Sequence, residues 1–384
     1  MSERPTLLII SLSTLAADAR VLRQIRAFTD RYAVTTVGYG PAPEGVVEHI
    51  RVPDEISSWA KDRRLLILRR YQSAYDTAPV IAHLTPLLEP GRWDVVIAND
   101  VDAVPLAVTL RPRGGVHADL HEYASRQNEE SRRWRWFVAP FRRWLVRTWV
   151  ARADSVTTVG AILAQEYRQE FGITAGVVPN AAPYADRSPT PVGEPLRLVH
   201  SGAARRNRSL SVMIEAVRRT RREVTLDLYL VPNDPAYLAK LQQEAADLPQ
   251  VRFNDPVTPD ELVERLGECD VGVFVLPPLT FNYLNTLPNK FFDFVQARLG
   301  IIVGPSPEMA ALVREHGLGV VTGDFTAESL ARALDELTPE AVAGFKGASH
   351  AVARQLSAEE QITGWTEAVD ALAARARGGG DPVR

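Results

Sequence analysis

Apolar runs of strand length alternate with longer segments of helical spacing along most of the chain. This alternation restricts the fold more than any other feature, because apolar strands separated by helices form parallel sheets with both faces covered. In the first half the expected strands are Leu7–Ser11, Ala33–Gly38, Val95–Ala98, Val116–Leu120 and Ser155–Val159. In the second half they are Leu196–Ser201, Leu226–Val231, Val251–Phe253, Val271–Leu276, Ile301–Val303 and Val320–Val321. The pattern predicts an α/β protein.

Helical segments lie between these strands. In the first half, Asp18–Thr29 carries apolar residues at helical spacing, with Asp18 as the expected N-cap. In the second half helices are expected at Ser209–Thr220, Pro235–Ala246, Pro259–Glu268, Pro288–Arg298, Pro307–His316 and Ala327–Leu334. Several begin with proline, which the first helical turn tolerates because its missing N–H has no partner there.

A proline-rich segment divides the two series of strands. Residues 181–195 contain four prolines and a glycine, which is typical of an interdomain linker. We therefore expect Rossmann-like domains at 1–185 and 196–357, with a linker at 186–195. Residues 358–384 should form a C-terminal helix that crosses back to the first domain, with a frayed tail. The two domains would face a cleft, with ligands at the carboxyl edges of the strands.

Composition excludes several functional classes. The net charge of −3 gives no reason to expect nucleic-acid binding, and the single cysteine fits a reducing, cytoplasmic compartment. No run reaches the roughly 18 apolar residues that a membrane span needs. The first strand is not followed by Gly-x-Gly-x-x-Gly, and the chain lacks a Walker A loop, a Gly-x-Ser-x-Gly elbow and Cys/His metal spacing. We expect no bound metal and no nicotinamide cofactor.

The segment Leu287–Asp293 is the strongest candidate for a ligand site. A helix is expected to start at Pro288, and the free amides of a helix N-terminus favour an anion. Asn289 and Lys290 lie in that first turn, where the lysine adds a full positive charge. Asp293, one turn later, suits hydrogen bonds from ribose hydroxyls. Together they suit a nucleoside diphosphate; the alternative is an ordinary helix start with an i, i+3 Lys–Asp pair.

The run from Leu287 to Glu308 resembles the donor-binding region of GT-B glycosyltransferases of the family 4 type, which are retaining and use nucleotide sugars. Those enzymes carry a Glu-x7-Glu motif whose second acid contacts the ribose, and Asp293 stands at that position. The first acidic position falls on Asn285, so the sequence departs from the motif there. The resemblance implies that Asn285 approaches the donor sugar and acts by hydrogen bonding, since an amide carries no charge.

The loop after the first strand of the second domain is a second phosphate candidate. Gly202 permits a tight turn, and Arg206 and Arg208 precede the next helix. The loop resembles a family element in which a glycine turn leads to a basic residue on the donor diphosphate, with Arg208 the first choice. The alternative is a solvated basic loop. Val257 ends a segment that resembles the strand whose following backbone contacts the nucleobase; an ordinary turn is the alternative.

Polar residues also end strands of the first domain. Asn99 and Asp100 follow one strand, and His121 and Glu122 follow the next, so both pairs lie at the ligand edge. The Asp-x-His-Glu sequence ending at Glu122 resembles a family element whose histidine reaches the donor sugar or acceptor. The segment Asp18–Val21 resembles the family's Asp-x-Arg-Val helix start. The alternatives are a capping role for Asp100 and a structural role for His121.

Residues 132–149 are dominated by arginine and tryptophan, and Pro140 is expected to divide them into two helical pieces. Basic residues with interfacial tryptophans suit peripheral contact with an anionic membrane. The alternative is a helix packed under the first sheet with its arginines outside.

The sequence with its resemblance predicts a retaining, metal-independent glycosyltransferase. It would move a sugar from a nucleoside-diphosphate sugar to a glycan, a lipid-linked sugar or a specialised metabolite. A nucleotide-sugar epimerase, a phosphorylase-like enzyme and a non-catalytic sugar-nucleotide-binding protein are the alternatives. The preference for arginine over lysine, together with the resemblance to glycan enzymes, suggests a bacterial enzyme of polysaccharide or natural-product biosynthesis. It would be cytoplasmic, and membrane-associated if its acceptor is lipid-linked.

Overall fold

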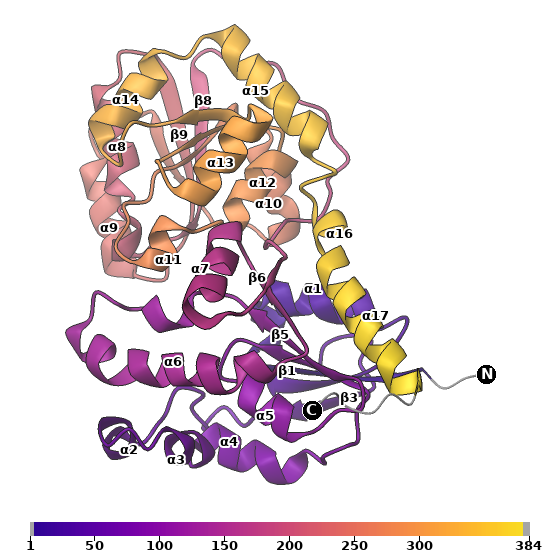
Figure 1. Ribbon diagram of the computed structural model, residues 1–384. Coiled ribbons are helices and arrows are strands. Elements are labelled where there is room, and N and C mark those ends of the chain that lie inside the picture. Colours follow the sequence, from indigo (N-terminus) through magenta and orange to yellow (C-terminus); the bar gives the residue numbers. More distant parts are fainter. Residues whose placement is uncertain (1–3, 379–384) are drawn as a thin grey trace. The chain divides into compact units, whose positions relative to one another are not determined.

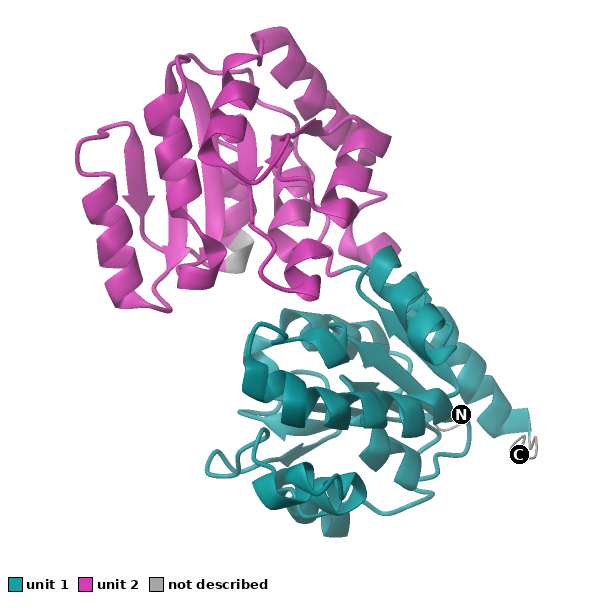
Figure 2. Cartoon of the chain, turned by 60° about the vertical axis from the view of Figure 1, so that its left-hand side comes forward, with its two compact units in different colours: residues 1–179, 362–384 teal, residues 180–361 magenta. Residues whose placement is uncertain are grey.

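The computed structural model describes residues 4–378, except the side chains of residues 259 and 260. The chain forms two compact units (Figure 2). Unit 1 combines residues 1–179 with 362–384, and unit 2 is the continuous stretch 180–361. The frayed tail expected at the C-terminus lies outside the described residues from 379 onward.

Unit 1 is built on a parallel sheet with the strand order β3-β2-β1-β4-β5-β6-β7. Its strands are β1 (Thr6–Thr14), β2 (Ala33–Tyr39), β3 (Glu48–Arg51), β4 (Val95–Asn99), β5 (Gly115–Leu120), β6 (Ser155–Thr158) and β7 (Gly176–Val177). The central strands are those that the apolar runs predict. The sequence did not predict β3 and β7, because β3 has one apolar residue and β7 has only two residues in all.

Helices flank the sheet of unit 1 (Figure 1). They are α1 (Ala19–Phe28), α2 (Arg63–Ile67), α3 (Tyr71–Asp76), α4 (Pro79–Leu84), α5 (Val104–Thr109), α6 (Ala139–Thr148), α7 (Ala161–Phe171) and α17 (Thr363–Gly378). Short helical turns add η1 (Leu15–Ala17), η2 (Thr85–Leu87), η3 (Ala124–Arg126), η4 (Trp134–Val138) and η5 (Val150–Arg152). Asp18 caps α1 as predicted, since its side chain accepts from the Val21 amide at 3.2 Å.

The last helix belongs to the core of unit 1. Trp365, Val369 and Leu372 of α17 are buried in one cluster with Leu7 and Ile9 of the central strand β1. The first strand and the last helix of the described residues therefore share one hydrophobic core.

Unit 2 repeats the architecture with the parallel order β10-β9-β8-β11-β12-β13. Its strands are β8 (Leu196–Ala203), β9 (Val224–Val231), β10 (Val251–Asn254), β11 (Val271–Phe274), β12 (Gly300–Val303) and β13 (Gly319–Val321). Its helices are α8 (Ser211–Arg219), α9 (Pro235–Glu244), α10 (Pro259–Leu266), α11 (Phe281–Leu284), α12 (Asn289–Gln296), α13 (Pro307–His316), α14 (Ala327–Asp335), α15 (Pro339–Val352) and α16 (Ala358–Gln361), with the turn η6 (Arg206–Arg208).

The proline-rich segment packs on unit 2. Arg187 donates to the Val263 carbonyl at 2.6 Å, and the Ala185 amide donates to the Gln296 side chain at 3.0 Å. The Lys346 ammonium of α15 donates to the Thr190 hydroxyl at 3.0 Å.

Both sheets reverse their strand order beside the first strand, between β1 and β4 and between β8 and β11. At such a switch point the loops diverge and leave a crevice at the carboxyl edge, where ligands of this fold class bind. None of the helices within residues 4–378 combines the length and apolarity that crossing a bilayer would require.

Candidate functional site

The carboxyl edge of unit 2 brings Lys290 next to His200 and Phe274. Lys290 lies in the first turn of α12, whose N-cap is Pro288. Its ammonium lies 3.1 Å from Nε2 of His200 on β8 and 4.5 Å above the ring of Phe274 on β11. The expected helix start therefore places its cation at the switch point between β8 and β11.

The position of Lys290 requires a glycine at residue 202, near the end of β8. Its φ of +137° lies in a region that L side chains rarely adopt. A Cβ added there would lie 2.6 Å from Nζ of Lys290. The glycine thus leaves room for the lysine as well as forming the turn.

His200 is uncharged in this cluster. Its Nδ1 lies 2.8 Å from the Val273 carbonyl, which can only accept, so Nδ1 carries the proton and Nε2 accepts from Lys290. Burial and then the nearby charge of Lys290 hold the pKa of His200 well below its usual range. The imidazole therefore fixes the lysine head without neutralising its charge.

Lys290 is itself strongly perturbed. Burial, followed by repulsion from Arg208, lowers the pKa of Lys290 to about 7, while the Asp293 carboxylate partly opposes this shift. A desolvated cation next to a second cation is stabilised by an anionic ligand, since such a ligand adds negative charge to that of Asp293. The geometry and the perturbation both favour anion binding.

Arg208 and Arg206 differ in their surroundings, although both lie in η6. Arg208 is half-buried, and its guanidinium lies 5.1 Å from the ring centroid of Tyr283. Asn207 donates to the Tyr283 hydroxyl at 2.6 Å, which joins η6 to α11. Arg206 instead pairs with Asp234, the N-cap of α9, at 3.0 Å. The structure thus groups Arg208 with Lys290 and directs Arg206 to another partner.

The remaining donor-side candidates occupy varied positions. Asp293 is half-buried one turn after Lys290, and Asn289 is exposed at the start of α12. Asn285 is buried and caps α11, and its amide donates to the Phe281 carbonyl of the same helix at 3.0 Å. Val257 is half-buried in the loop between β10 and α10.

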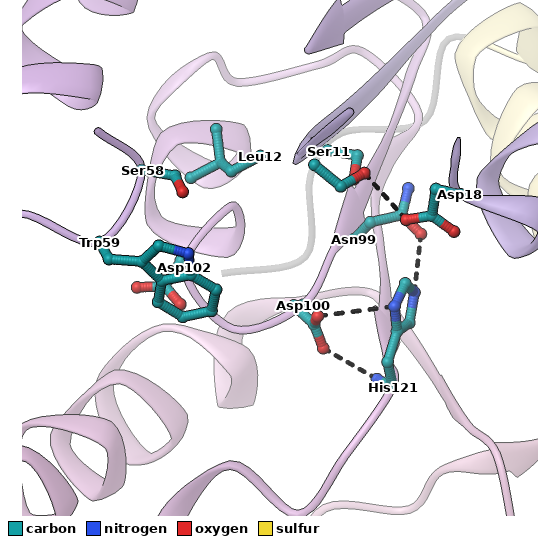
Figure 3. A pocket seen from close by; sticks show the side chains of 10 residues that line it. Ser11, Leu12, Asp18, Ser58, Trp59, Asn99, Asp100, Asp102 and His121 are labelled. Carbon is teal, nitrogen blue, oxygen red and sulfur yellow. Dashed lines mark hydrogen bonds and ion pairs between the residues drawn. The ribbon is translucent and has the colours of Figure 1, made fainter. Parts of the chain in front are cut away.

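A polar pocket of about 460 Å³, partly open to solvent, lies at the carboxyl edge of unit 1 (Figure 3). Ser11 on β1 is in register with Asn99 on β4, and the two form its floor. Asp18, Asp100, Asp102 and His121 are among its other polar lining residues, and Trp59 is its large aromatic one. The Asn99 amide Nδ2 is buried and has no hydrogen-bond partner among the described residues.

His121 lies among acceptor atoms in this pocket (Figure 3). Its Nε2 lies 3.1 Å from Oδ1 of Asn99, and its Nδ1 lies 3.5 Å from Oδ2 of Asp100. Burial lowers the pKa of His121, but Asp100 and Asp119 outweigh it, so that the pKa is raised above its usual value. The ring is thus biased towards the doubly protonated form, in which both nitrogens donate.

Asp119 is the centre of a buried network behind His121. Arg20 binds both of its oxygens at 2.7 Å, and Thr157 and Gln24 also donate to it at 2.7 Å. Trp365 of α17 donates at 3.2 Å. Burial alone would raise the pKa of Asp119, but Arg20 and the hydrogen bonds hold it well below its usual range. The Asp-x-Arg-Val helix start therefore supplies the internal partner of this carboxylate.

Glu122 follows His121, and its backbone carbonyl accepts from the Tyr167 hydroxyl at 2.7 Å. Reduced hydration and then the charge of Asp100 raise the pKa of Glu122 to about 6. In the arginine- and tryptophan-rich segment, the helical pieces η4 and α6 meet at Ala139, beside Pro140. The first piece is exposed, and the second buries one face in unit 1.

His200, Phe274, Tyr283, Ser11 and Trp59 were not predicted as site residues. His200 lies two residues before Gly202 on the same strand, and alternation places both on one face. That spacing was the available signal for His200. Ser11 and Phe274 lie on predicted strands, but the pattern does not show which strands are neighbours at a site. Tyr283 and Trp59 lie on a short helix and in a turn whose paths the pattern does not give.

One protein-family model matches most of the unit that holds this cation cluster. Residues 195–339 match the family model described as Glycosyl transferases group 1. The match supports a glycosyltransferase. It runs from the start of β8 to the start of α15 and includes Gly202, Arg208 and Lys290. No curated protein sequence matches the chain.

Solved glycosyltransferase structures resemble the chain over nearly its whole length. HepE from Anabaena, in complex with UDP and glucose, has 14% identity and a TM-score of 0.66, over 97% of this chain and 100% of that chain. Sucrose-phosphate synthase from Thermosynechococcus elongatus has 13% identity and a TM-score of 0.70, over 97% and 100%. The UDP-forming α,α-trehalose-phosphate synthase from Burkholderia vietnamiensis has 12% and 0.68, over 98% and 99%. This likeness confirms the predicted pair of Rossmann-like domains of the GT-B fold.

Proposed function

We propose that the chain transfers a glycosyl unit from a nucleoside-diphosphate sugar to an acceptor hydroxyl. The observation that carries the proposal is the cation cluster of unit 2. Lys290 is held by a neutral imidazole at a helix N-terminus, beside Arg208 and against Gly202. A diphosphate supplies the two negative groups that such a cluster lacks.

In this proposal Lys290 and Arg208 bind the diphosphate and stabilise the charge that develops on it as the glycosidic bond breaks. Fixed cations in a poorly hydrated site do this without a divalent ion. Asp293 would accept hydrogen bonds from the ribose, and Asn289 would offer its amide to the phosphates. Retention of the anomeric configuration rests on the family resemblance of the segment 287–308.

The pocket of unit 1 is proposed as the acceptor side. Its serines, carboxylates and the free Asn99 amide can pair with sugar hydroxyls, since hydroxyls both donate and accept. His121 has its nitrogens directed at acceptors and a raised pKa, so it would act as a fixed donor. The raised pKa favours the protonated ring, in which both nitrogens donate, and we propose an orienting and electrostatic role for it.

A thermal-shift screen with UDP, GDP, ADP and dTDP tests the donor site. A ligand that binds only the folded state stabilises it by about 2.7 kcal/mol when present at roughly 100 times its Kd. We expect UDP to give the largest rise in Tm, because the structurally similar HepE was solved in complex with UDP and with UDP-glucose. Transfer from the matching nucleotide sugar should be unchanged by EDTA. The proposal fails if none of the four nucleotides raises the Tm.

A further inference from the structure

Two neighbouring segments of unit 1 expose large apolar side chains. Ile67 and Leu68 at the end of α2 are 57% and 66% exposed, and Trp136 and Phe137 of η4 are 73% and 38% exposed. We call residues 63–70 and 132–137 together the α2–η4 surface. Ordinary surfaces scatter such side chains singly, whereas a grouped set marks an interaction site.

Packing holds the two segments side by side. α2 contacts η4 directly, and α2 and α3 lie next to α6 (Figure 1). The ring of Tyr71 at the start of α3 lies 5.9 Å from the rings of both Phe141 and Trp144 of α6. This aromatic group fixes residues 63–70 beside the start of α6, so the exposed apolar side chains form one surface.

The surface is strongly basic. All four arginines of residues 63–70 are exposed, and so are all three arginines of residues 132–137. Neither segment contains an acidic residue. Ion pairs nearby use other arginines, such as Arg126 with Glu129 and Arg143 with Glu170. Apolar and tryptophan side chains flanked by arginines fit the interface of an anionic bilayer, where the former enter the headgroup region and the latter pair with phosphates.

Trp59 links this surface to the pocket of unit 1. It is 69% exposed and lines the pocket together with Asp100 and Ser11. The Arg142 guanidinium of α6 lies 5.7 Å from its ring centroid, and α6 continues directly from η4. One rim of the pocket is thus built on the same helical segment as the α2–η4 surface.

We propose that unit 1 docks on an anionic phospholipid bilayer through the α2–η4 surface, and that the acceptor in its pocket is the headgroup of a lipid that remains in that bilayer. The assignment of the acceptor as a lipid headgroup rests on the proposed function. A lipid-linked acceptor diffuses in the plane of the membrane, and a pocket beside the docking surface receives its headgroup without extracting the lipid chain.

Vesicle flotation tests the docking surface. The full chain should float with phosphatidylcholine vesicles that contain phosphatidylglycerol and should stay unbound with phosphatidylcholine alone. Leu68→Glu and Trp136→Glu should each weaken binding by roughly tenfold, since each removes an apolar contact and adds repulsion from the lipid phosphates. Val47→Glu is the matched control, because Val47 is 59% exposed outside this surface and should leave binding unchanged.

Two results would overturn the docking proposal. The first is a wild-type chain that does not float with phosphatidylglycerol vesicles. The second is a Trp136→Glu chain that floats as well as the wild type. Concentration-dependent dimers that disappear in Leu68→Glu, without any flotation of the wild type, would assign the surface to a second copy of the chain instead.

The acceptor is tested separately from the donor site. With a lipid-linked sugar in anionic vesicles, Trp136→Glu should lose transfer while UDP still raises its Tm as in the wild type. Lys290→Met should show the reverse, with vesicle binding kept and the UDP shift lost. Equal transfer by wild type and Trp136→Glu on the vesicle-borne acceptor would refute the lipid-linked acceptor. A wild-type Tm that none of UDP, GDP, ADP and dTDP raises would refute the donor site alone.

Discussion

The two units differ in how far the protein compensates a buried charge. In unit 1 the Asp119 carboxylate receives hydrogen bonds from Arg20, Gln24 and Thr157, so its charge is compensated within the protein. In unit 2 the Lys290 ammonium meets a neutral imidazole and an aromatic ring, with Arg208 nearby. The first arrangement is complete and positions its neighbours. The second keeps two cations close together beside a single carboxylate, Asp293, and the proposed diphosphate would balance the remaining charge.

Burial acts on the titratable groups of both units, and the charges beside each group decide whether its pKa rises or falls. Burial opposes the charged form of every one of these groups. It prevails at His200 and Lys290, whose pKa values fall, whereas carboxylates overcome it at His121, whose pKa rises. Three predictions test the contrast.

Asp119→Asn should have the largest effect. It leaves Arg20 buried without its counter-charge, and breaking a buried pair in this way costs about 3–5 kcal/mol of stability. Urea denaturation of the full chain would measure the loss. Asp54→Asn is the control, because its pair with Arg51 is exposed and its loss should leave the free energy of unfolding nearly unchanged. Equal effects of the two variants would contradict the contrast.

Lys290→Met should mainly affect function. Removing one preorganised donor to a developing charge typically lowers kcat by roughly 100- to 1,000-fold. Folding should not suffer, because the variant removes a poorly hydrated cation from a partly apolar site. Lys240→Met is the control, since Lys240 is exposed and pairs with its helix neighbour Glu244 at 3.3 Å. A transfer rate within a few-fold of wild type would contradict the assignment of Lys290.

The smallest effect is a pH dependence that Lys290 imposes on both binding and stability. Above a pKa of about 7 the free protein has lost the Lys290 proton, which a bound diphosphate would need. UDP affinity should therefore fall roughly tenfold between about pH 7 and about pH 8.5, and Lys290→Met should abolish this dependence. Calorimetric titration at several pH values would measure it, and a flat wild-type profile would contradict the shifted pKa.

Stability should move the other way over the same range. Unfolded Lys290 keeps its proton up to about the ordinary value of 10.5, whereas the folded group releases it at about 7. The unfolded state therefore binds the extra proton between these values, and the Lys290 contribution to the free energy of unfolding rises with pH across that window.

The fold was largely predictable, because parallel sheets use continuous apolar strands that a sequence displays directly. The exceptions are instructive: β3 lies at a sheet edge and carries polar residues, and β7 is too short for any pattern. The predicted start of α12 was correct to within one residue, since Pro288 is the N-cap and Asn289 is the first helical residue. Local chemistry therefore determines most element boundaries.

The surroundings of the site residues were less predictable, since they depend on contacts between distant parts of the chain. Nothing near Lys290 in sequence indicates His200, which lies ninety positions away and fixes its head. The Asp-x-Arg-Val motif gave no sign that Arg20 would bind Asp119, or that Trp365 would join them. The sequence does not show that the apolar residues of α2 belong to a larger surface, because their neighbour η4 comes from another part of the chain.

The position of α17 has a consequence for synthesis on the ribosome. Residues 1–179 emerge first, but their core lacks Trp365, Val369 and Leu372 until the final helix has been made. Unit 2 is continuous and has all of its residues before that point. Unit 1 starts to emerge before unit 2, but it can complete its core only after unit 2 has been made. A chain that ends between residues 361 and 362 would therefore hold every residue of unit 2 and lack part of the core of unit 1.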